Sequence, residues 1–345
     1  MITAVLLFIA GLILLIKGGD WFVDGATGIA HRFNLPELLI GATVVSIGTT
    51  LPEVMVSATS AVGGHSEIAY GNAIGSIICN TALIAAITIA VRPGKVARKS
   101  LTMPICFFFF SAVFYAATAY ISGSFSRVTG ILLLLIFVIY MVCTVYSMTH
   151  EKPDAEKEAE HQKGKTNEKK KTNQKEETDQ KDETNQKETS LGKEVTLLII
   201  GAAIIAVGAD LLVDNGTLIA QALGVPESVI ALTLVALGTS LPELVTAITS
   251  LIKGHSALSL GNIIGANLFN LVLVCGVSVT LNPLEIPVNS VIFGQNASLV
   301  LDIPVMFLVM LILVVPAFVK QKLYRVQGIA LLIIYFSYCT IQFMM

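Results

Sequence analysis

Two glutamates in apolar surroundings are the residues of this sequence whose type and spacing could do chemistry. Glu53 and Glu243 are the only acidic side chains in the middle of their long apolar segments, and no Lys or Arg lies mid-segment nearby. A carboxylate inside a bilayer is costly unless its charge is compensated, and two that share a low-dielectric site repel each other. A divalent cation between them relieves that repulsion. The pair therefore predicts a cation site, with a protonated, structurally hydrogen-bonded glutamate as the alternative.

Neutral oxygen ligands are expected beside each glutamate. Pro52 and Pro242 each lack a backbone donor and clash with the carbonyl four residues back, so we expect both helices to break there. Unwound backbone in a membrane is tolerated where it lines a cavity, although a hydroxyl can instead bond to its own helix. The expected ligands are the carbonyls of Ser46 to Thr50 and of Ala236 to Ser240, and the hydroxyls of Thr49, Thr50, Thr239 and Ser240.

A second wall of the site is expected from the segment that follows each glutamate. Asn72, Ser76 and Asn80 recur every four residues and so share one helical face. Their counterparts 190 residues later are Asn262, Ala266 and Asn270. We expect ion or water contact for the deeper pair, Asn80 and Asn270. For Asn72 and Asn262, hydrogen bonding between helices is an equal alternative. Stripes of small residues that permit close helix approach are formed by Gly71, Gly75, Gly261 and Gly265.

This set of oxygens suits a hard cation. Ca²⁺ accepts flexible coordination by many oxygens, whereas Mg²⁺ dehydrates reluctantly. Soft transition metals are disfavoured, because the expected site has neither a thiolate nor a histidine. We expect loop or cap roles for His65 and His255. Interfacial solvation or bonding between helices is expected for Asp20, Asp24, Asp210 and Asp214.

The composition requires a membrane to position these residues. The 345 residues are 54% hydrophobic and 13% charged, with a mean hydropathy of +0.78, which places the chain in the membrane class. Net charge is near zero, so nothing points to a nucleic-acid partner. Segments long enough to cross a bilayer as helices run over approximately 2–30, 35–63, 67–91, 101–121, 127–148, 194–223, 226–252, 257–281, 291–318 and 325–344.

A polar linker divides the chain into two homologous halves, 1–150 and 194–345. The linker, 151–193, is rich in Lys and Glu with almost no aliphatic side chains, which predicts a disordered tether. Shifted by 190 residues, the sequence matches itself without a gap, with 17 identities in 40 positions between 41–80 and 231–270. Because the shift carries five apolar segments, the halves must cross the membrane in opposite directions. We therefore predict an all-α membrane protein of ten transmembrane helices, arranged as two inverted five-helix repeats.

Positive charge predicts the orientation. Arg32, Arg92, Lys253 and Lys320 follow the first, third, seventh and ninth segments, and the Lys-rich linker follows the fifth. Loops after even-numbered segments have almost no Lys or Arg, apart from Arg127. Lys and Arg favour cytoplasmic loops, so the loops after odd-numbered segments should be cytoplasmic. We expect a multi-pass protein of the cell (plasma or inner) membrane. Its linker would be cytoplasmic and both termini outside.

The two motifs resemble a known family. Gly48-Thr-Thr-Leu-Pro-Glu53 and Gly238-Thr-Ser-Leu-Pro-Glu243, each followed by Gly-Asn-x-Ile-Gly, resemble the alpha-repeats of the prokaryotic type of sodium/calcium exchanger, within the cation/Ca²⁺ antiporter superfamily. The resemblance covers everything except the linker. It implies a secondary active antiporter that exchanges Ca²⁺ for Na⁺ by alternating access, in which the first and sixth helices slide against the rest. The implied ion-binding residues are Glu53, Glu243, Thr49, Thr239, Thr50, Ser240, Ser46, Ala236, Ser76, Asn80 and Asn270.

Departures from the family pattern leave the coupling ion open. Ala266 replaces the serine that matches Ser76, and Asn270 stands where some relatives have Asp, which makes K⁺ coupling less favoured. An H⁺/Ca²⁺ antiporter on the same fold is the main alternative, and a passive cation channel is a further one. No enzymatic site, cofactor or obligatory protein partner is evident. The expected partners are Ca²⁺, Na⁺ and the lipid bilayer.

Overall fold

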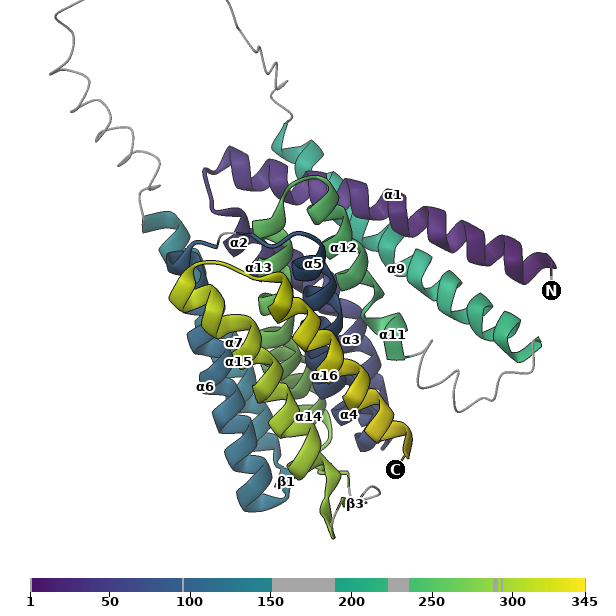
Figure 1. Ribbon diagram of the computed structural model, residues 1–345, viewed down its shortest axis with the longest axis vertical. Coiled ribbons are helices and arrows are strands. Elements are labelled where there is room, and N and C mark those ends of the chain that lie inside the picture. Colours follow the sequence, from purple (N-terminus) through teal and green to yellow (C-terminus); the bar gives the residue numbers. More distant parts are fainter. Residues whose placement is uncertain are drawn as a thin grey trace, which may run out of the picture.

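The computed structural model describes residues 2–94, 96–150, 190–222, 236–287, 291–292 and 294–344. This part of the chain is almost entirely helical (Figure 1). The helices, with π-helical stretches written η, are α1 (Ile2–Arg32), α2 (Glu37–Ile40), η1 (Gly41–Val45), α3 (Ser46–Val62), α4 (Ser66–Cys79), η2 (Asn80–Ala85), α5 (Ala86–Val91), α6 (Arg98–Ser122), α7 (Arg127–His150), α9 (Leu191–Ala222), α11 (Ala236–Thr239), α12 (Leu241–Ile252), α13 (Ser256–Phe269), η4 (Asn270–Val274), α14 (Cys275–Leu281), η5 (Ser298–Asp302), α15 (Ile303–Lys320) and α16 (Arg325–Met344).

Eight of the helical stretches in the described part of the chain are long and apolar enough to cross a membrane. Of the ten predicted segments, 226–252 is described only from Ala236 onward, as α11 and the short α12, and 325–344 is the helix α16. The predicted linker falls outside the described residues over 151–189, and α9 already begins at Leu191.

The ninth segment begins later than predicted. Residues expected to open a helix at 291 instead form a small hairpin of β3 (Val291–Ile292) and β4 (Gln295–Asn296). Gly294 turns it with a φ of +77°, a backbone conformation that favours glycine. Asn296 then accepts a hydrogen bond from the Ser298 backbone N–H at 2.8 Å, so the helical stretch starts at Ser298. A second short ladder joins β1 (Ser124–Phe125) to β2 (Leu284–Glu285).

The break expected at both prolines occurs in one half only. In the second half α11 ends at Thr239, and Ser240 is a non-helical turn residue before α12. In the first half the prediction is wrong, because α3 runs without interruption through Pro52. The helix instead widens upstream into η1, where the Ser46 hydroxyl donates to the Gly41 carbonyl at 2.7 Å. This is a local change of helical hydrogen bonding and not an unwinding of the backbone.

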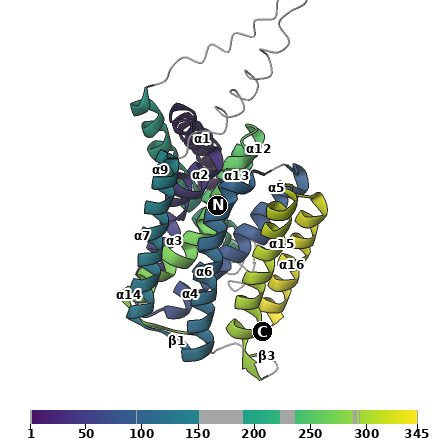
Figure 2. The same ribbon diagram turned by 90° about the vertical axis from the view of Figure 1, so that its left-hand side faces the viewer.

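Helices α1 and α9 lie side by side and antiparallel, at an angle to the other long helices (Figures 1 and 2). Their contact is made through glycine. A Cβ on Gly11 would lie 2.8 Å from the carbonyl oxygen of Gly208, and a Cβ on Gly201 would lie 2.5 Å from the backbone nitrogen of Phe22. Two helices approach this closely only where side chains are absent.

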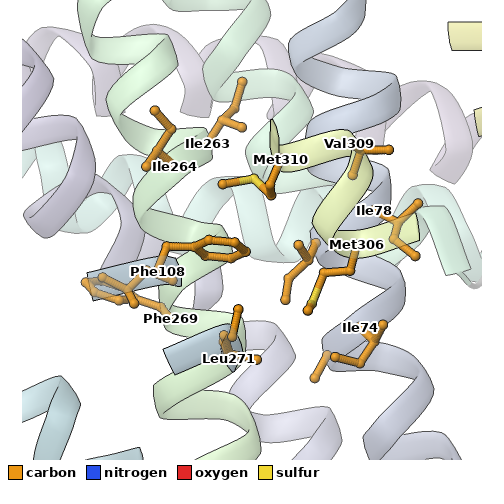
Figure 3. Close-up of a cluster of buried hydrophobic side chains, with 14 of the residues drawn as sticks. Ile74, Ile78, Phe108, Ile263, Ile264, Phe269, Leu271, Met306, Val309 and Met310 are labelled. Carbon is orange, nitrogen blue, oxygen red and sulfur yellow. The ribbon is translucent and has the colours of Figure 1, made fainter. Parts of the chain in front are cut away.

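The remaining helices share a continuous apolar core. Figure 3 shows its centre, where Ile74 and Ile78 of α4, Phe269 at the end of α13, and Met306 and Met310 of α15 gather. The outward faces of the same bundle are also apolar. Exposed side chains of that kind include Leu6, Ile13, Phe110, Val142, Ile333 and Phe336. Apolar surface on this scale is typical of a protein that faces lipid.

Loops that carry most of the basic residues in the described part of the chain meet at one end of the bundle, which we call the basic end. The backbone N–H of Val96 donates to the Gln321 carbonyl, and that of Leu323 donates to the Gly94 carbonyl, both at 2.9 Å. Arg92 donates to the Leu251 carbonyl at 3.1 Å. The loops that follow the third, seventh and ninth predicted segments thus lie on one side, as their charge predicted.

Candidate cation site

The two glutamates predicted from the sequence lie in the centre of the bundle. Glu53 of α3 and Glu243 of α12 are both 0% exposed, on helices that pack against each other. Their charges act on one another across this contact. None of the four carboxyl oxygens has a hydrogen-bond partner among the residues that the structure describes. A buried carboxylate without a partner is unfavourable, so the geometry calls for positive charge between the two.

Two asparagine amides complete the same centre. Asn80 begins η2 and Asn270 begins η4, and both side chains are 0% exposed. The packing is crossed, because η2 contacts α12, which carries Glu243, and η4 contacts α3, which carries Glu53. Neither amide has a partner in the described part of the chain. Changes to π-helical geometry recur at functional positions in proteins, and here two of them begin at these asparagines.

Hydroxyls beside the glutamates differ in what they bond. Thr50 and Ser240 are 0% and 1% exposed, and neither hydroxyl bonds to its own helix or to another described group. Thr49 instead donates to the amide oxygen of Asn262 at 3.1 Å. The alternative of back-bonding to the helix is therefore not taken at Thr50 or Ser240, and their oxygens are available to a ligand.

The remaining predicted ligands are Ser46, Ser76, Thr239 and Ala236. Ser46 is fully buried and donates to the carbonyls of Gly41 and Asn262 at 2.7 and 3.0 Å. Ser76 is 4% exposed on α4, Thr239 ends α11, and Ala236 begins it. The helices that carry these residues and the two glutamates, α3, α4, α11 and α12, pack against one another.

Asn72 and Asn262 both form hydrogen bonds between helices, which is one of the two roles predicted for them. Asn72 donates to the Glu53 carbonyl at 3.2 Å and to the Ser57 hydroxyl at 2.8 Å. Asn262 accepts from Thr49, as described above, and also lies 3.3 Å from the Ser46 hydroxyl. Both amides therefore hold the helices that carry the site.

The predicted glycine stripes make close helix contacts in the second half but not, among the described residues, in the first half. A Cβ on Gly261 or Gly265 would collide with the backbone of α2 and η1, as expected for close approach. No described atom lies within 4 Å of a Cβ placed on Gly71 or Gly75. Their counterpart contacts would fall on residues 228–232, which lie outside the described residues.

A cavity of about 820 Å³ lies beside the site, between the α1–α9 pair and helices α3, α11 and α12. It reaches Thr49 and Thr239, and its wall includes Asp210 and Asp214 of α9. The other two predicted aspartates bond between helices, because Lys253 lies 3.4 Å from Asp20 and 2.8 Å from Asp24. His65 and His255 are the residues before α4 and α13, and His255 also contacts Glu37 at 2.8 Å.

A buried acid in the middle of a predicted segment was missed by the sequence reasoning. Asp302, 9% exposed at the end of η5, accepts hydrogen bonds from Tyr338 at 3.0 Å and Gln342 at 2.7 Å. An Asp in the middle of the ninth apolar segment was the available signal. Its two donors tie α16 to the start of α15, away from the glutamate pair.

The unpartnered atoms at this centre are of the kind that hard cations prefer. Its available atoms are carboxylate, amide and hydroxyl oxygens, which suit Ca²⁺ or Na⁺. Thiolates and imidazoles, the ligands of softer metals, do not belong to the predicted set that the structure gathers.

Both halves of the chain match a known family. The family model for the sodium/calcium exchanger protein matches residues 3–146 and 193–344. The chain is 30% identical to the sodium/calcium exchanger MaX1 of Methanosarcina acetivorans, over 98% of both chains. It is 33% identical to the inner membrane protein YrbG of Escherichia coli, over 89% of this chain and 88% of YrbG.

A solved structure extends the likeness to the fold. The structure of the sodium-calcium exchanger NCX_Mj soaked with Na⁺ and Sr²⁺ superposes with a TM-score of 0.75 at 32% identity, over 97% of both chains. Family model, relatives and fold agree over both halves. The chain therefore belongs to the sodium/calcium exchanger family of membrane antiporters.

Proposed function

We propose that this protein is a secondary active antiporter that exchanges Ca²⁺ for Na⁺ across the cell membrane. The observation that carries the proposal is the buried pair Glu53 and Glu243, whose carboxyl oxygens have no partner in the described part of the chain. Asn80, Asn270 and the neighbouring hydroxyls supply neutral oxygens to the same centre. Either one Ca²⁺ or several Na⁺ ions could compensate the two negative charges, and competition for the same oxygens would couple the two fluxes.

The ligands we propose for the transported ions are those predicted from the sequence. Glu53 and Glu243 provide the charge, while the hydroxyls of Thr50 and Ser240 and the amides of Asn80 and Asn270 face the same centre. The lesser contributors are Ser46, Thr49, Ser76, Ala236 and Thr239.

Alternating access would use the α1–α9 pair. The pair meets through glycines, and the cavity beside Thr49 and Thr239 lies between it and the site-bearing helices. Movement of the pair along the bundle would open or close this cavity. Because close glycine contacts and the Arg32–Glu194 ion pair at 2.9 Å join the two helices, they could move as one unit.

Two inverted five-helix repeats are the architecture that best explains the contacts. Asn282 donates to the Ala61 carbonyl at 2.9 Å, as Arg92 does to the Leu251 carbonyl at 3.1 Å. The 190-residue shift carries Arg92 onto position 282 and Ala61 onto position 251. Each contact is thus the counterpart of the other, at opposite ends of the bundle. The basic end would be cytoplasmic, with the linker, and both termini would lie outside.

Uptake of radiolabelled Ca²⁺ into proteoliposomes under imposed ion gradients tests the proposal. We expect uptake to follow an outward Na⁺ gradient, to saturate with Ca²⁺, and to disappear in Glu53→Gln and Glu243→Gln. Uptake driven by a pH gradient and indifferent to Na⁺ would select H⁺/Ca²⁺ antiport, and a K⁺ requirement would select K⁺-coupled exchange. Flux that needs no counter-ion and does not saturate would identify a channel.

A further inference from the structure

Buried hydroxyls in these helices usually bond to their own backbone. Ser111 donates to the Phe107 carbonyl, Thr144 to that of Tyr140 and Ser278 to that of Val274, each at 2.8 Å. This is the ordinary solution for serine and threonine in an apolar helix. A buried hydroxyl that makes no such bond therefore needs a different explanation.

Three buried serine and threonine hydroxyls outside the glutamate centre make no hydrogen bond within the described part of the chain. Thr246 and Ser250 of α12 are 0% exposed, and Ser259 of α13 is 3% exposed. None of the three oxygens has a hydrogen-bond partner among the described residues. Burying an unpaired hydroxyl is unfavourable unless water or an ion satisfies it.

The three hydroxyls lie on the way from the site to the basic end. Thr246 and Ser250 follow Glu243 by three and seven residues, which places them on one face of α12. From Glu243 to Ser250 the helix rises about 10 Å. Ser259 comes from α13, which packs against α12 as the second arm of a helical hairpin.

A small cavity lies at the basic end, next to Ser259. Ser259 lines a cavity of about 140 Å³ at the basic end, together with Glu37 of α2 and Arg92. Ser256 and Thr88 add further hydroxyls to its wall. Polar groups of α12, α13 and α5 are thus present both beside the glutamate centre and at the basic end.

The first half of the chain does not repeat this feature. The counterparts of Thr246 and Ser259 are Val56 and Ala69, and only Ser250 has a hydroxyl counterpart, Ser60. The hydroxyls are therefore not a by-product of the duplication.

We propose that Thr246, Ser250 and Ser259 form a hydroxyl path by which Na⁺, with the water that hydrates it, passes between the glutamate centre and the basic end. The inference rests on the proposed function. A path of neutral oxygens suits a monovalent cation, because a divalent ion costs more to take out of water. Bound water satisfies the same hydroxyls when no ion passes.

Substitutions that copy the other half of the chain test the path. Thr246→Val and Ser259→Ala install the counterpart residues, and Ser250→Ala removes the middle hydroxyl. We expect each to slow Na⁺-driven Ca²⁺ uptake about threefold, and the triple variant to slow it about tenfold or more. Thr144→Val and Ser111→Ala are the matched controls, because they remove buried hydroxyls that bond to their own helices. The controls should retain the wild-type rate.

Thermal unfolding separates a path from a structural role. If the three hydroxyls serve only passing ions and water, their removal leaves the melting temperature unchanged or raises it. A fall in melting temperature that accompanies the slower uptake would overturn the proposal, as would uptake in the triple variant equal to that of the controls. If the wild-type chain itself shows no Na⁺-driven uptake, the proposed antiport fails with it. These outcomes are therefore distinguishable.

Access of a small cation gives a second readout. Ag⁺ is monovalent, close to Na⁺ in size and reactive with thiols, so it should block transport by Ser250→Cys beyond the background that the five native cysteines give in the wild-type chain. Na⁺ should protect against the block. Ser111→Cys is the buried control. Equal sensitivity of Ser250→Cys, Ser111→Cys and wild type would exclude the path.

Discussion

At the scale of single residues, the predicted site stands out because its buried polar atoms lack hydrogen-bond partners among the described residues. The carboxylates of Glu53 and Glu243 and the amides of Asn80 and Asn270 are wholly buried and without a described partner. The other two buried acids in the described part of the chain are satisfied, because Asp302 accepts from Tyr338 and Glu194 from Arg32. A concentration of unpaired oxygens at one point marks a binding site rather than a badly packed core.

Neutralising the glutamates should separate binding from folding. We expect Glu53→Gln, Glu243→Gln and the double variant to melt at or above the wild-type temperature without added cations, because charge repulsion in the buried centre is reduced. Ca²⁺ at about 100 times its dissociation constant should stabilise the wild type by about 2.7 kcal/mol and leave the double variant unchanged. Scanning fluorimetry in detergent measures both effects.

An exposed acid is the control for this comparison. Glu285→Gln, at the exposed β2, should respond to Ca²⁺ as the wild type does. A Ca²⁺ response of the double variant equal to that of Glu285→Gln would contradict the assignment of the two glutamates as ion ligands.

The hydroxyl that is present at Ser76 and absent at Ala266 should affect the affinity for Na⁺. Both positions are buried, and only the first half supplies a hydroxyl. We expect Ser76→Ala to raise the Na⁺ concentration for half-maximal transport, and Ala266→Ser to lower it, each by about threefold for one hydroxyl oxygen. Transport measured over a series of Na⁺ concentrations gives both values. Shifts of the same sign in both variants would contradict the expectation.

At the scale of elements, the α1–α9 pair depends on glycine at its contact. Its close approaches involve Gly11, Gly18, Gly25, Gly201 and Gly208, which meet backbone of the opposite helix. Helical glycine ordinarily costs stability relative to alanine. The close contact must therefore offset that cost, and the pair should be sensitive to a single added methyl group.

Two glycines of α9 provide a test of the close contact with α1 and its control. Gly201→Ala should lower the melting temperature and slow transport, because the new Cβ meets the backbone of Phe22 at 2.5 Å. Gly192→Ala, in the first turn of α9, meets only the Ser190 hydroxyl at 3.9 Å and should be neutral or stabilising by about 1 kcal/mol. Thermal unfolding and Ca²⁺ uptake of both variants check this. Gly201→Ala behaving like Gly192→Ala would count against the close contact.

At the scale of the whole molecule, charge and apolar surface are arranged for a membrane. Loops rich in Lys and Arg meet at one end through contacts such as Arg92 to Leu251. The outer faces of α1, α6, α7 and α16 expose large apolar side chains. Positive charge at one end favours the cytoplasmic side, which gives the molecule one preferred orientation.

Protease access to vesicles of known sidedness tests that orientation. Trypsin should cut the Lys-rich stretch 151–190 in inside-out vesicles and leave it intact in right-side-out ones, because this segment is expected on the cytoplasmic side. An epitope at either terminus should show the opposite accessibility. Cleavage of the linker from the outside would refute the proposed topology.

Much of this could be predicted from the sequence because it depends on local pattern. Apolar length predicted the membrane helices, and unusual residue types in apolar runs predicted Glu53 and Glu243. The positions of Asp20 and Asp24 suggested bonding between helices, which the ion pairs with Lys253 confirm. The uninterrupted α3 was not predicted, because whether a helix unwinds at Pro52 or widens at η1 depends on the helices packed around it.

The sequence by itself determined that the chain is a membrane protein of internally repeated halves, with one buried glutamate in each motif. Hydrophobicity and identity under a fixed shift are properties of the order of residues alone. Only the tertiary structure decided which polar atoms remain unpaired. Thr49 bonds to Asn262, whereas the hydroxyls of Thr50 and Thr246 have no hydrogen-bond partner among the described residues. The physical reason is that hydrogen-bond satisfaction depends on which groups from distant segments approach within about 3 Å.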